Sequence, residues 1–219
     1  RVDEKRKAAA ASCVWLMMIF GFAMTAGISG RLLDPFSFER LILVSFSVSC
    51  IAVVLSFTAL YGLEPKVSKE ITPNNNQAKL RFKEALADVW QESRVRRFTI
   101  FVFISMLAYS SQDLILEPFA GTAFGLTPGE TTSLSGLQHA GVLCGMLLCG
   151  FVTNKSKSPS LSSLRMWTVG GCIASALAML SLVMSGIVGP SWPFLGTVFI
   201  LGVSNGAFSI AAIGSMMQF

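Results

Sequence analysis

The 219-residue sequence carries little charge: 13% of its residues are Asp, Glu, Lys or Arg, and 53% are hydrophobic. An average soluble domain has about 25% charged residues. Residues 41–62 and 166–195 contain no charged residue at all. Such runs predict transmembrane helices, because about 20 residues at 1.5 Å rise cross a hydrocarbon core of about 30 Å. The sequence therefore excludes a soluble globular domain, and its 17 Phe argue against a disordered chain.

The sequence also lacks the signatures of several soluble protein classes. A single histidine excludes a two-histidine metal site, and no P-loop, HExxH or G-x-S-x-G motif is present. The five cysteines lie in apolar segments without the spacing of a metal site or a disulfide framework. We therefore predict that the protein is not an enzyme and holds no free metal ion. Cytoplasmic Lys and Arg explain the net charge of +5 without a nucleic-acid partner.

Hydrophobic segments predict the fold class, which is an all-α polytopic membrane protein with six transmembrane helices. The segments span residues 8–30, 41–62, 98–119, 134–152, 166–188 and 194–219. Glycines recur at four-residue spacing in two of them, as Gly141 with Gly145 and Gly202 with Gly206. Small residues at this spacing predict close packing between membrane helices.

Basic residues predict how the chain is oriented in the bilayer. Residues 1–7 carry four Lys or Arg, connection 63–97 carries eight and connection 153–165 carries three. Connection 31–40 carries the remaining two of the 17. An excess of Lys and Arg marks cytoplasmic loops. The start of the chain and connections 63–97 and 153–165 are therefore predicted to face the cytoplasm.

One long basic connection between short-looped helices is typical of transporters built from two helical bundles. On this layout, residues 1–62 close an N-terminal bundle, 63–97 form a central cytoplasmic linker and 98–219 open a C-terminal bundle. Because the first residue is Arg and the last lies in an apolar run, the chain is expected to be an internal part of a longer protein.

The second half of the linker predicts an amphipathic helix on the cytoplasmic membrane surface. Its apolar face is formed by Phe82, Leu86, Val89 and Trp90, and its basic cluster by Arg94, Arg96 and Arg97. Basic residues at this position favour contact with lipid headgroups. Docking of a soluble partner is the alternative interpretation.

Three ionisable residues fall inside the apolar segments, namely Asp113, Glu117 and His139. Such residues are costly in a membrane and are functional candidates. Asp113 lies about 22 Å and Glu117 about 28 Å along segment 98–119, measured from its cytoplasmic end. His139 lies about 12 Å in from the outer surface if its helix begins near Thr131. These depths predict an outward-opening polar cluster that also includes Gln112 and Gln138. Pro118 is expected to end or kink the first of these helices.

The residues leave the role of this cluster open. Glu117 fits a solvated interfacial residue equally well, and His139 fits a core histidine bonded to a nearby carbonyl. An Asp113–His139 pair suits proton coupling, because the pKa of histidine lies near neutrality. Histidine or acidic side chains also suit the binding of a magnesium-centred pigment.

Residues 113–134, DLILEPFAGTAFGLTPGETTSL, resemble the signature of the PucC family, and residues 27–41, GISGRLLDPFSFERL, resemble a second stretch of that family. The matching positions in the first stretch are Asp113, Glu117, Pro118, Gly121, Phe124, Gly125, Gly129, Glu130, Thr131 and Thr132. The resemblance implies a major-facilitator-like fold in which the six segments are helices five to ten of twelve.

The resemblance further implies a pigment-handling role in a photosynthetic membrane, either a thylakoid or a bacterial inner membrane. The expected ligand is chlorophyll or bacteriochlorophyll, with His139 or Glu117 as an axial ligand to the pigment magnesium. The expected partners are the lipid bilayer and the apoproteins of light-harvesting complexes or photosystems. A proton-coupled transporter of a small solute and a non-transporting scaffold are the alternatives.

Overall fold

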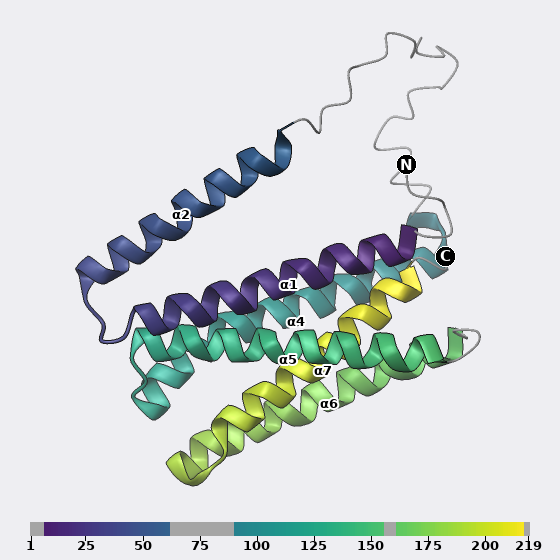
Figure 1. Cartoon of the computed structure of the whole chain (residues 1–219). Coiled ribbons are helices and arrows are strands. Elements are labelled where there is room, and N and C mark those ends of the chain that lie inside the picture. The colour runs from purple at the N-terminus through teal and green to yellow at the C-terminus, as the bar shows by residue number, and fades with distance from the viewer. Residues whose placement is uncertain (1–6, 62–89, 156–160, 217–219) are drawn as a thin grey trace. The chain divides into compact units, whose positions relative to one another are not determined.

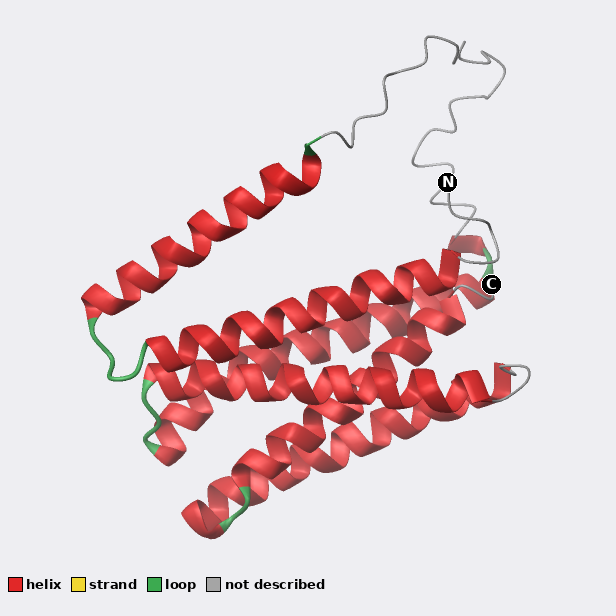
Figure 2. Cartoon of the chain, in the orientation of Figure 1, coloured by secondary structure: helices red, strands yellow, loops and turns green. Residues whose placement is uncertain are grey.

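The computed structural model describes residues 7–61, 90–155 and 161–216. Helices and loops make up this part of the chain, and no strand occurs in it (Figure 2). The long helices are α1 (Lys7–Leu32), α2 (Phe38–Leu60), α4 (Ser93–Phe124), α5 (Pro128–Lys155), α6 (Leu161–Val188) and α7 (Phe194–Met216). A short 3-10 turn, η2 (Gly189–Ser191), joins α6 to α7.

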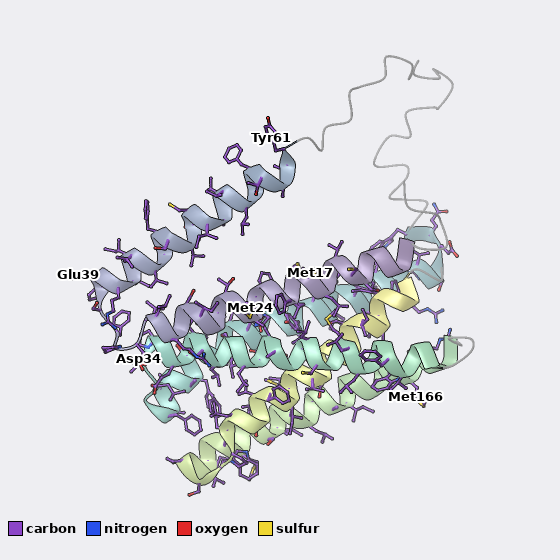
Figure 3. The ribbon with its side chains drawn as sticks, viewed as in Figure 1. Met17, Met24, Asp34, Glu39, Tyr61 and Met166 are labelled. Atoms are coloured by element: carbon purple, nitrogen blue, oxygen red, sulfur yellow. The ribbon has the colours of Figure 1, made fainter. Side chains whose placement is uncertain are left out.

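All six long helices are long and apolar enough to cross a membrane, which confirms the predicted fold class. A helix satisfies its own backbone polar groups, so it is the element that apolar sequence adopts in a bilayer. The chain is therefore an integral membrane protein. Along α1 and α2, apolar side chains project into the surroundings (Figure 3), including Met17 on α1 and Phe57 on α2, which are 64% and 73% exposed. Lipid or further protein covers these faces in the membrane.

Two features of α4 differ from the sequence prediction. Pro118 does not end this helix, which continues to Phe124. The carbonyl of Pro118 accepts a hydrogen bond of 2.8 Å from the Thr122 hydroxyl. Threonine hydroxyls are one of the means by which membrane helices accommodate proline. The helix also begins earlier than expected, at Ser93, so that Arg96 and Arg97 belong to its first turns.

The predicted amphipathic helix lies mostly outside the described residues, including Phe82, Leu86 and Val89. Trp90 and Gln91 are helical, and a bend at Glu92 separates them from α4. Trp90 is exposed, as a surface-lying residue would be. The surface helix and the three-part domain division therefore stay predictions.

The described chain divides into two units, one comprising residues 1–41 and 113–219 and the other residues 42–112. In the first unit, α5 packs against α1 and against α7, and α6 packs against α7 (Figure 1). Side chains from four helices of this unit form its largest apolar core: Leu116, Ala120, Leu134, Ala178, Leu182, Phe194, Val198 and Leu201. The unit thus places α5 at the centre of its helix packing.

Glycines allow α5 and α7 to approach backbone to backbone. A Cβ on Gly145 would overlap the Val203 carbonyl oxygen, and one on Gly206 would overlap that of Val142. Gly141 and Gly202 lie with their Cα atoms in equally close approach, since a Cβ on either would come within 3.2 Å of the other's Cα. The two four-residue glycine pairs therefore pack against each other, which confirms their predicted packing role.

Candidate functional site

The family-like stretch 113–134 builds the connection between α4 and α5. Gly125 ends α4 with a φ of 66°, a left-handed conformation that side chains with a Cβ adopt at a cost. Its N–H donates to the Gly121 carbonyl at 3.1 Å, which is the hydrogen bond of an αL helix cap. The glycine at this motif position is therefore explained by the backbone of the turn.

The start of α5 is a capping box, in which two residues bond to each other's backbone. The Thr127 N–H donates to Glu130 Oε2 at 2.8 Å, and the Glu130 N–H donates to the Thr127 hydroxyl at 3.3 Å. Pro128 occupies the first helical position, where its missing N–H costs nothing. The hydroxyls of Thr131 and Thr132 both donate to the Pro128 carbonyl. Glu130 and both threonines thus have structural roles.

The two family-like stretches lie side by side in the first unit. A Cβ on Gly129 would be 2.9 Å from the Gly30 carbonyl oxygen and 3.1 Å from the Asp34 nitrogen. A Cβ on Gly30 would in turn overlap the Ser133 hydroxyl. Two segments about a hundred residues apart in sequence therefore meet through paired glycines. Gly121, by contrast, has only an ordinary contact, with Leu126.

Phe124 joins the α4–α5 connection to the start of α7. Its ring stacks on Phe194 with centroids 4.3 Å apart, and Phe119 contacts both rings from α4. Aromatic pairs of this kind contribute about 0.5–1.5 kcal/mol beyond their buried area. The motif phenylalanine therefore packs the end of α4 against the start of α7.

A polar contact joins α4 and α5. Gln138 Nε2 donates to Asp113 Oδ1 at 3.0 Å. Gln138 is 1% exposed, and Asp113 is half-buried. Gln138 of α5 thus contacts Asp113 of α4 inside the polar cluster that the sequence predicts, and the role of these residues as a ligand or proton site stays a prediction.

Glu117 lies one turn further along α4 than Asp113. Its Oε1 accepts a hydrogen bond of 2.6 Å from the Ser135 hydroxyl on α5, and its side chain is exposed. Exposure agrees with the interpretation of Glu117 as a solvated residue at the membrane interface. Together, the Asp113–Gln138 and Glu117–Ser135 pairs give α4 two polar contacts with α5.

His139 is half-buried on α5, and its Nδ1 lies 2.8 Å from the Ser135 carbonyl oxygen. Because a carbonyl only accepts hydrogen bonds, the proton resides on Nδ1, and Nε2 of the neutral ring keeps its lone pair. Nε2 has no hydrogen-bond partner among the described residues. Phe22 of α1 meets the ring edge to face, with centroids 5.6 Å apart.

The described residues test only part of what the sequence predicts for His139, Gln112 and the arginine cluster. His139 lies within electrostatic range of Asp113, but its hydrogen bond is to its own helix. Gln112 is half-buried directly before Asp113 and belongs to the other unit. Its place in the cluster stays a prediction, as do headgroup contacts of Arg94, Arg96 and Arg97. No group of three His, Cys, Asp or Glu side chains that could hold a metal ion occurs within the described ranges.

Sequence reasoning missed Thr127, Ser135 and Phe22. Thr127 had a detectable signal, because Thr-x-x-Glu before an apolar run is the pattern of a capping box. Ser135 lies one turn before His139 on the same helix, a spacing that permits its carbonyl to meet the ring. Phe22 had no such signal, since many phenylalanines occupy α1 and neighbouring segments.

Comparison with known proteins gives relatives over almost the whole chain. A family model described as PUCC protein matches residues 1–219. The Bacteriochlorophyll synthase 44.5 kDa chain of Rhodobacter capsulatus is 46% identical over 98% of this chain and 49% of its own length. Protein PucC of the same species is 25% identical over 99% of this chain and 46% of its own. Protein PucC of Cereibacter sphaeroides is 27% identical over 86% of this chain and 40% of its own length.

The chain spans about half the length of these curated relatives. No solved structure matches the chain. The relatives come from photosynthetic purple bacteria.

Proposed function

Because the chain belongs to the PucC family, we propose that it is part of a pigment-handling membrane protein. It binds a bacteriochlorophyll-type tetrapyrrole and assists the assembly of light-harvesting complexes or photosystems. The proposal is supported by the names of its relatives, Bacteriochlorophyll synthase 44.5 kDa chain and Protein PucC. A bacterial inner membrane is the proposed location, with residues 63–97 in the cytoplasm.

One observation on the chain's own residues carries the proposal. The Ser135 carbonyl fixes the proton of His139 on Nδ1, so the Nε2 lone pair is available as a ligand. Neutral imidazole is the commonest metal ligand in proteins, and a backbone carbonyl often orients it. A magnesium ion already held by four ring nitrogens requires only an axial donor, so a larger cluster of protein ligands is unnecessary. His139 is therefore the proposed axial ligand, and Glu117 is the alternative one.

The test is the absorption spectrum of gently purified protein from a pigment-producing host. We expect stoichiometric bacteriochlorophyll bands in the wild type and at least a tenfold loss of bound pigment in His139→Ala. Imidazole added to His139→Ala is expected to restore pigment, since it supplies the missing ligand. The matched control is Ser111→Ala, which removes a hydroxyl from an exposed position of α4. Pigment-free wild-type protein, or His139→Ala with wild-type pigment content, would contradict the proposal.

A proton-coupled transporter of a small solute is the second candidate. It is favoured by Asp113, a half-buried carboxylate inside a membrane span that is held by a neutral amide. Intramembrane acids of this kind serve in proton relays. Uptake into proteoliposomes that follows a pH gradient and disappears in Asp113→Asn would support this candidate. Unchanged uptake in that variant would exclude Asp113 as its proton site.

We further propose that the protein acts without catalysing a reaction, and that its helices follow a major-facilitator-like plan. One relative is named a synthase, so the expected lack of catalysis needs a direct test. Purified protein incubated with a pigment precursor and the corresponding isoprenoid diphosphate is expected to give no new pigment. A third candidate, a pure scaffold, would co-purify with apoproteins while carrying neither pigment nor transport activity.

A further inference from the structure

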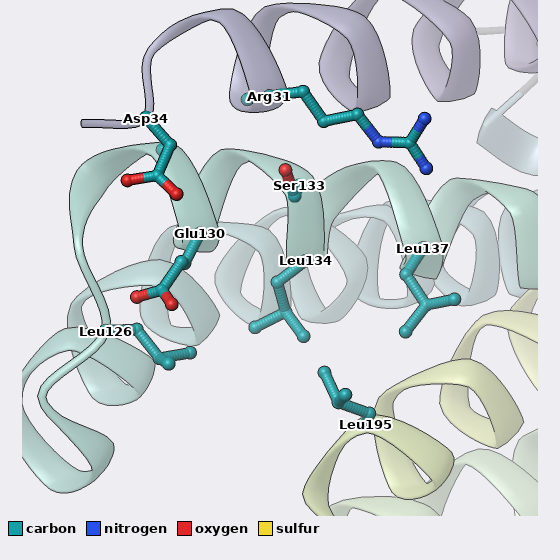
Figure 4. Close-up of a pocket in the computed structure, with 10 residues that line it drawn as sticks. Arg31, Asp34, Leu126, Glu130, Ser133, Leu134, Leu137 and Leu195 are labelled. Carbon is teal, nitrogen blue, oxygen red and sulfur yellow. The ribbon is translucent and has the colours of Figure 1, made fainter. Parts of the chain in front are cut away.

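A pocket of about 470 Å³ lies where the two family-like stretches meet (Figure 4). Its polar lining comprises Arg31, Asp34, Glu130 and Ser133. Its apolar lining comprises Leu126, Leu134, Leu137 and Leu195. Figure 4 shows the carboxylates of Asp34 and Glu130 toward one end and the Arg31 side chain extending toward the other. The pocket therefore separates negative from positive charge above an apolar wall.

Three polar groups of this pocket are not used by the fold. Among the described residues, the Arg31 guanidinium, the Ser133 hydroxyl and the Asp34 carboxylate have no hydrogen-bond or ion-pair partner. Glu130 differs, because its Oε2 caps the start of α5. Arg40 reaches Asp34, but it donates to the backbone carbonyl, at 3.1 Å, and not to the carboxylate. The pocket thus offers a cationic donor, a hydroxyl and an anionic acceptor to a ligand.

The pocket lies at the level of a membrane–water interface. The apolar span of α1 ends at Leu32, next to Arg31 and Asp34, and that of α5 begins at Pro128. Leu134 and Leu137 lie about 9 Å and about 14 Å into the span of α5, so the apolar wall extends to acyl-chain depth. A ligand that fills this pocket is accordingly polar at one end and apolar at the other.

We propose that this pocket binds an amine phospholipid, that is, a phosphate ester with a protonated primary amine. Arg31 and Ser133 donate to the phosphate, Asp34 accepts from the ammonium, and the leucines contact the start of an acyl chain. The carboxylates disfavour a lipid with net negative charge. A quaternary ammonium cannot donate hydrogen bonds to Asp34. Lipid binding at this pocket requires no pigment, so its test is independent of the test of the proposed function.

Native mass spectrometry of the purified full chain in detergent tests the proposal with three lipids of equal chain length. These are phosphatidylethanolamine, phosphatidylglycerol and phosphatidylcholine. We expect the wild type to bind phosphatidylethanolamine at least fivefold more tightly than the other two. Arg31→Gln is expected to weaken that binding at least tenfold. Asp34→Asn is expected to lose the preference while still binding phosphatidylglycerol.

The matched control is Arg165→Gln, which removes the same charge from an exposed position outside the pocket lining. It is expected to bind all three lipids as the wild type does. Arg31 and Asp34 are exposed, and the melting temperature without lipid checks that their variants fold. Equal wild-type affinity for the three lipids, or unchanged binding in Arg31→Gln, would overturn the proposal. Water-soluble phosphoethanolamine that binds as tightly as the lipid would overturn the role of the leucine wall.

Discussion

Two faces of α5 contact their neighbours in different ways. Toward α7, glycines bring the two backbones into contact, so that Gly145 and Gly206 have no room for a Cβ. Toward α4, the contact is made by side chains, through the Asp113–Gln138 and Glu117–Ser135 hydrogen bonds. One face therefore depends on the absence of side chains, and the other depends on polar ones.

This difference distinguishes the contact that stabilises the fold, between α5 and α7, from the contact whose polar side chains are candidates for function, between α4 and α5. Membrane helices gain little from apolar burial against one another, because lipid is equally apolar, so close packing supplies their stability. Polar side chains at a membrane-embedded contact are instead costly and are retained where they have a role. The α5–α7 face is the structural contact, and the α4–α5 face with His139 is the functional candidate.

The largest effect is expected at the α5–α7 face. Gly145→Ala should lower the stability by about 3 kcal/mol, because its Cβ overlaps the Val203 carbonyl and overpacking forces the backbones apart. Gly150→Ala, on the same helix with open space around it, should stabilise by up to about 1 kcal/mol through helix propensity. Melting temperatures in detergent measure both. Equal shifts in the two variants would show that the close packing is not what holds α5 to α7.

A smaller effect is expected from Gln138→Leu. This variant leaves the half-buried Asp113 carboxylate without its donor, at a cost of about 1–2 kcal/mol. The double variant Asp113→Leu with Gln138→Leu should recover most of that loss, because two apolar partners leave nothing unsatisfied. Chemical unfolding of the three variants gives the coupling energy. A double variant no more stable than Gln138→Leu would show that the loss does not come from the unpaired carboxylate.

Removing the helix cap at the α4–α5 connection should cost about 1 kcal/mol. Thr127→Ala removes the hydroxyl that accepts from the Glu130 N–H. Thr58→Ala is the matched control, since the exposed Thr58 hydroxyl bonds only within its own helix, α2. Thermal melting compares the two variants. A loss in Thr58→Ala as large as that in Thr127→Ala would argue against the cap as the cause.

The smallest effect on stability is expected at the exposed Glu117–Ser135 pair. Glu117→Gln should change the stability by less than about 0.5 kcal/mol, because the side chain is exposed and its amide oxygen can still accept from the Ser135 hydroxyl. Bound pigment measured in the same preparation sharpens the comparison. Pigment loss as large as in His139→Ala, at unchanged stability, would transfer the proposed ligand role to Glu117.

Patterns of spacing predicted the fold well. The apolar segment 166–188 became α6 at Leu161–Val188, and the two glycine pairs do pack closely. Depth along the helices also predicted polar side chains facing each other between α4 and α5, where Gln138 contacts Asp113, because rise per residue fixes the level of each side chain. These properties follow from helix geometry alone, so a single sequence contains them.

The sequence was less informative where a neighbouring helix decides the outcome. Pro118 was expected to end or kink α4. It does not end the helix, which the Thr122 hydroxyl and the packed surroundings of Leu116 and Ala120 sustain. The tautomer of His139 depends on which group its ring meets, and spacing left several choices open. Likewise, the motif glycines Gly125 and Gly129 look alike in sequence, yet one serves a backbone turn and the other a helix contact.

Because α5 packs against both α1 and α7, its position also affects the order in which the helices of the first unit assemble during synthesis. When α5 leaves the ribosome, α1 has already been made, but its partner α7 has not. The chain from Lys155 to Phe194 must be synthesised first, which takes a few seconds at about 5–20 residues per second. During that interval the glycine face of α5 is open to lipid or to the insertion machinery. We therefore expect α5 to dock on α1 before α7 arrives to pack against its other side.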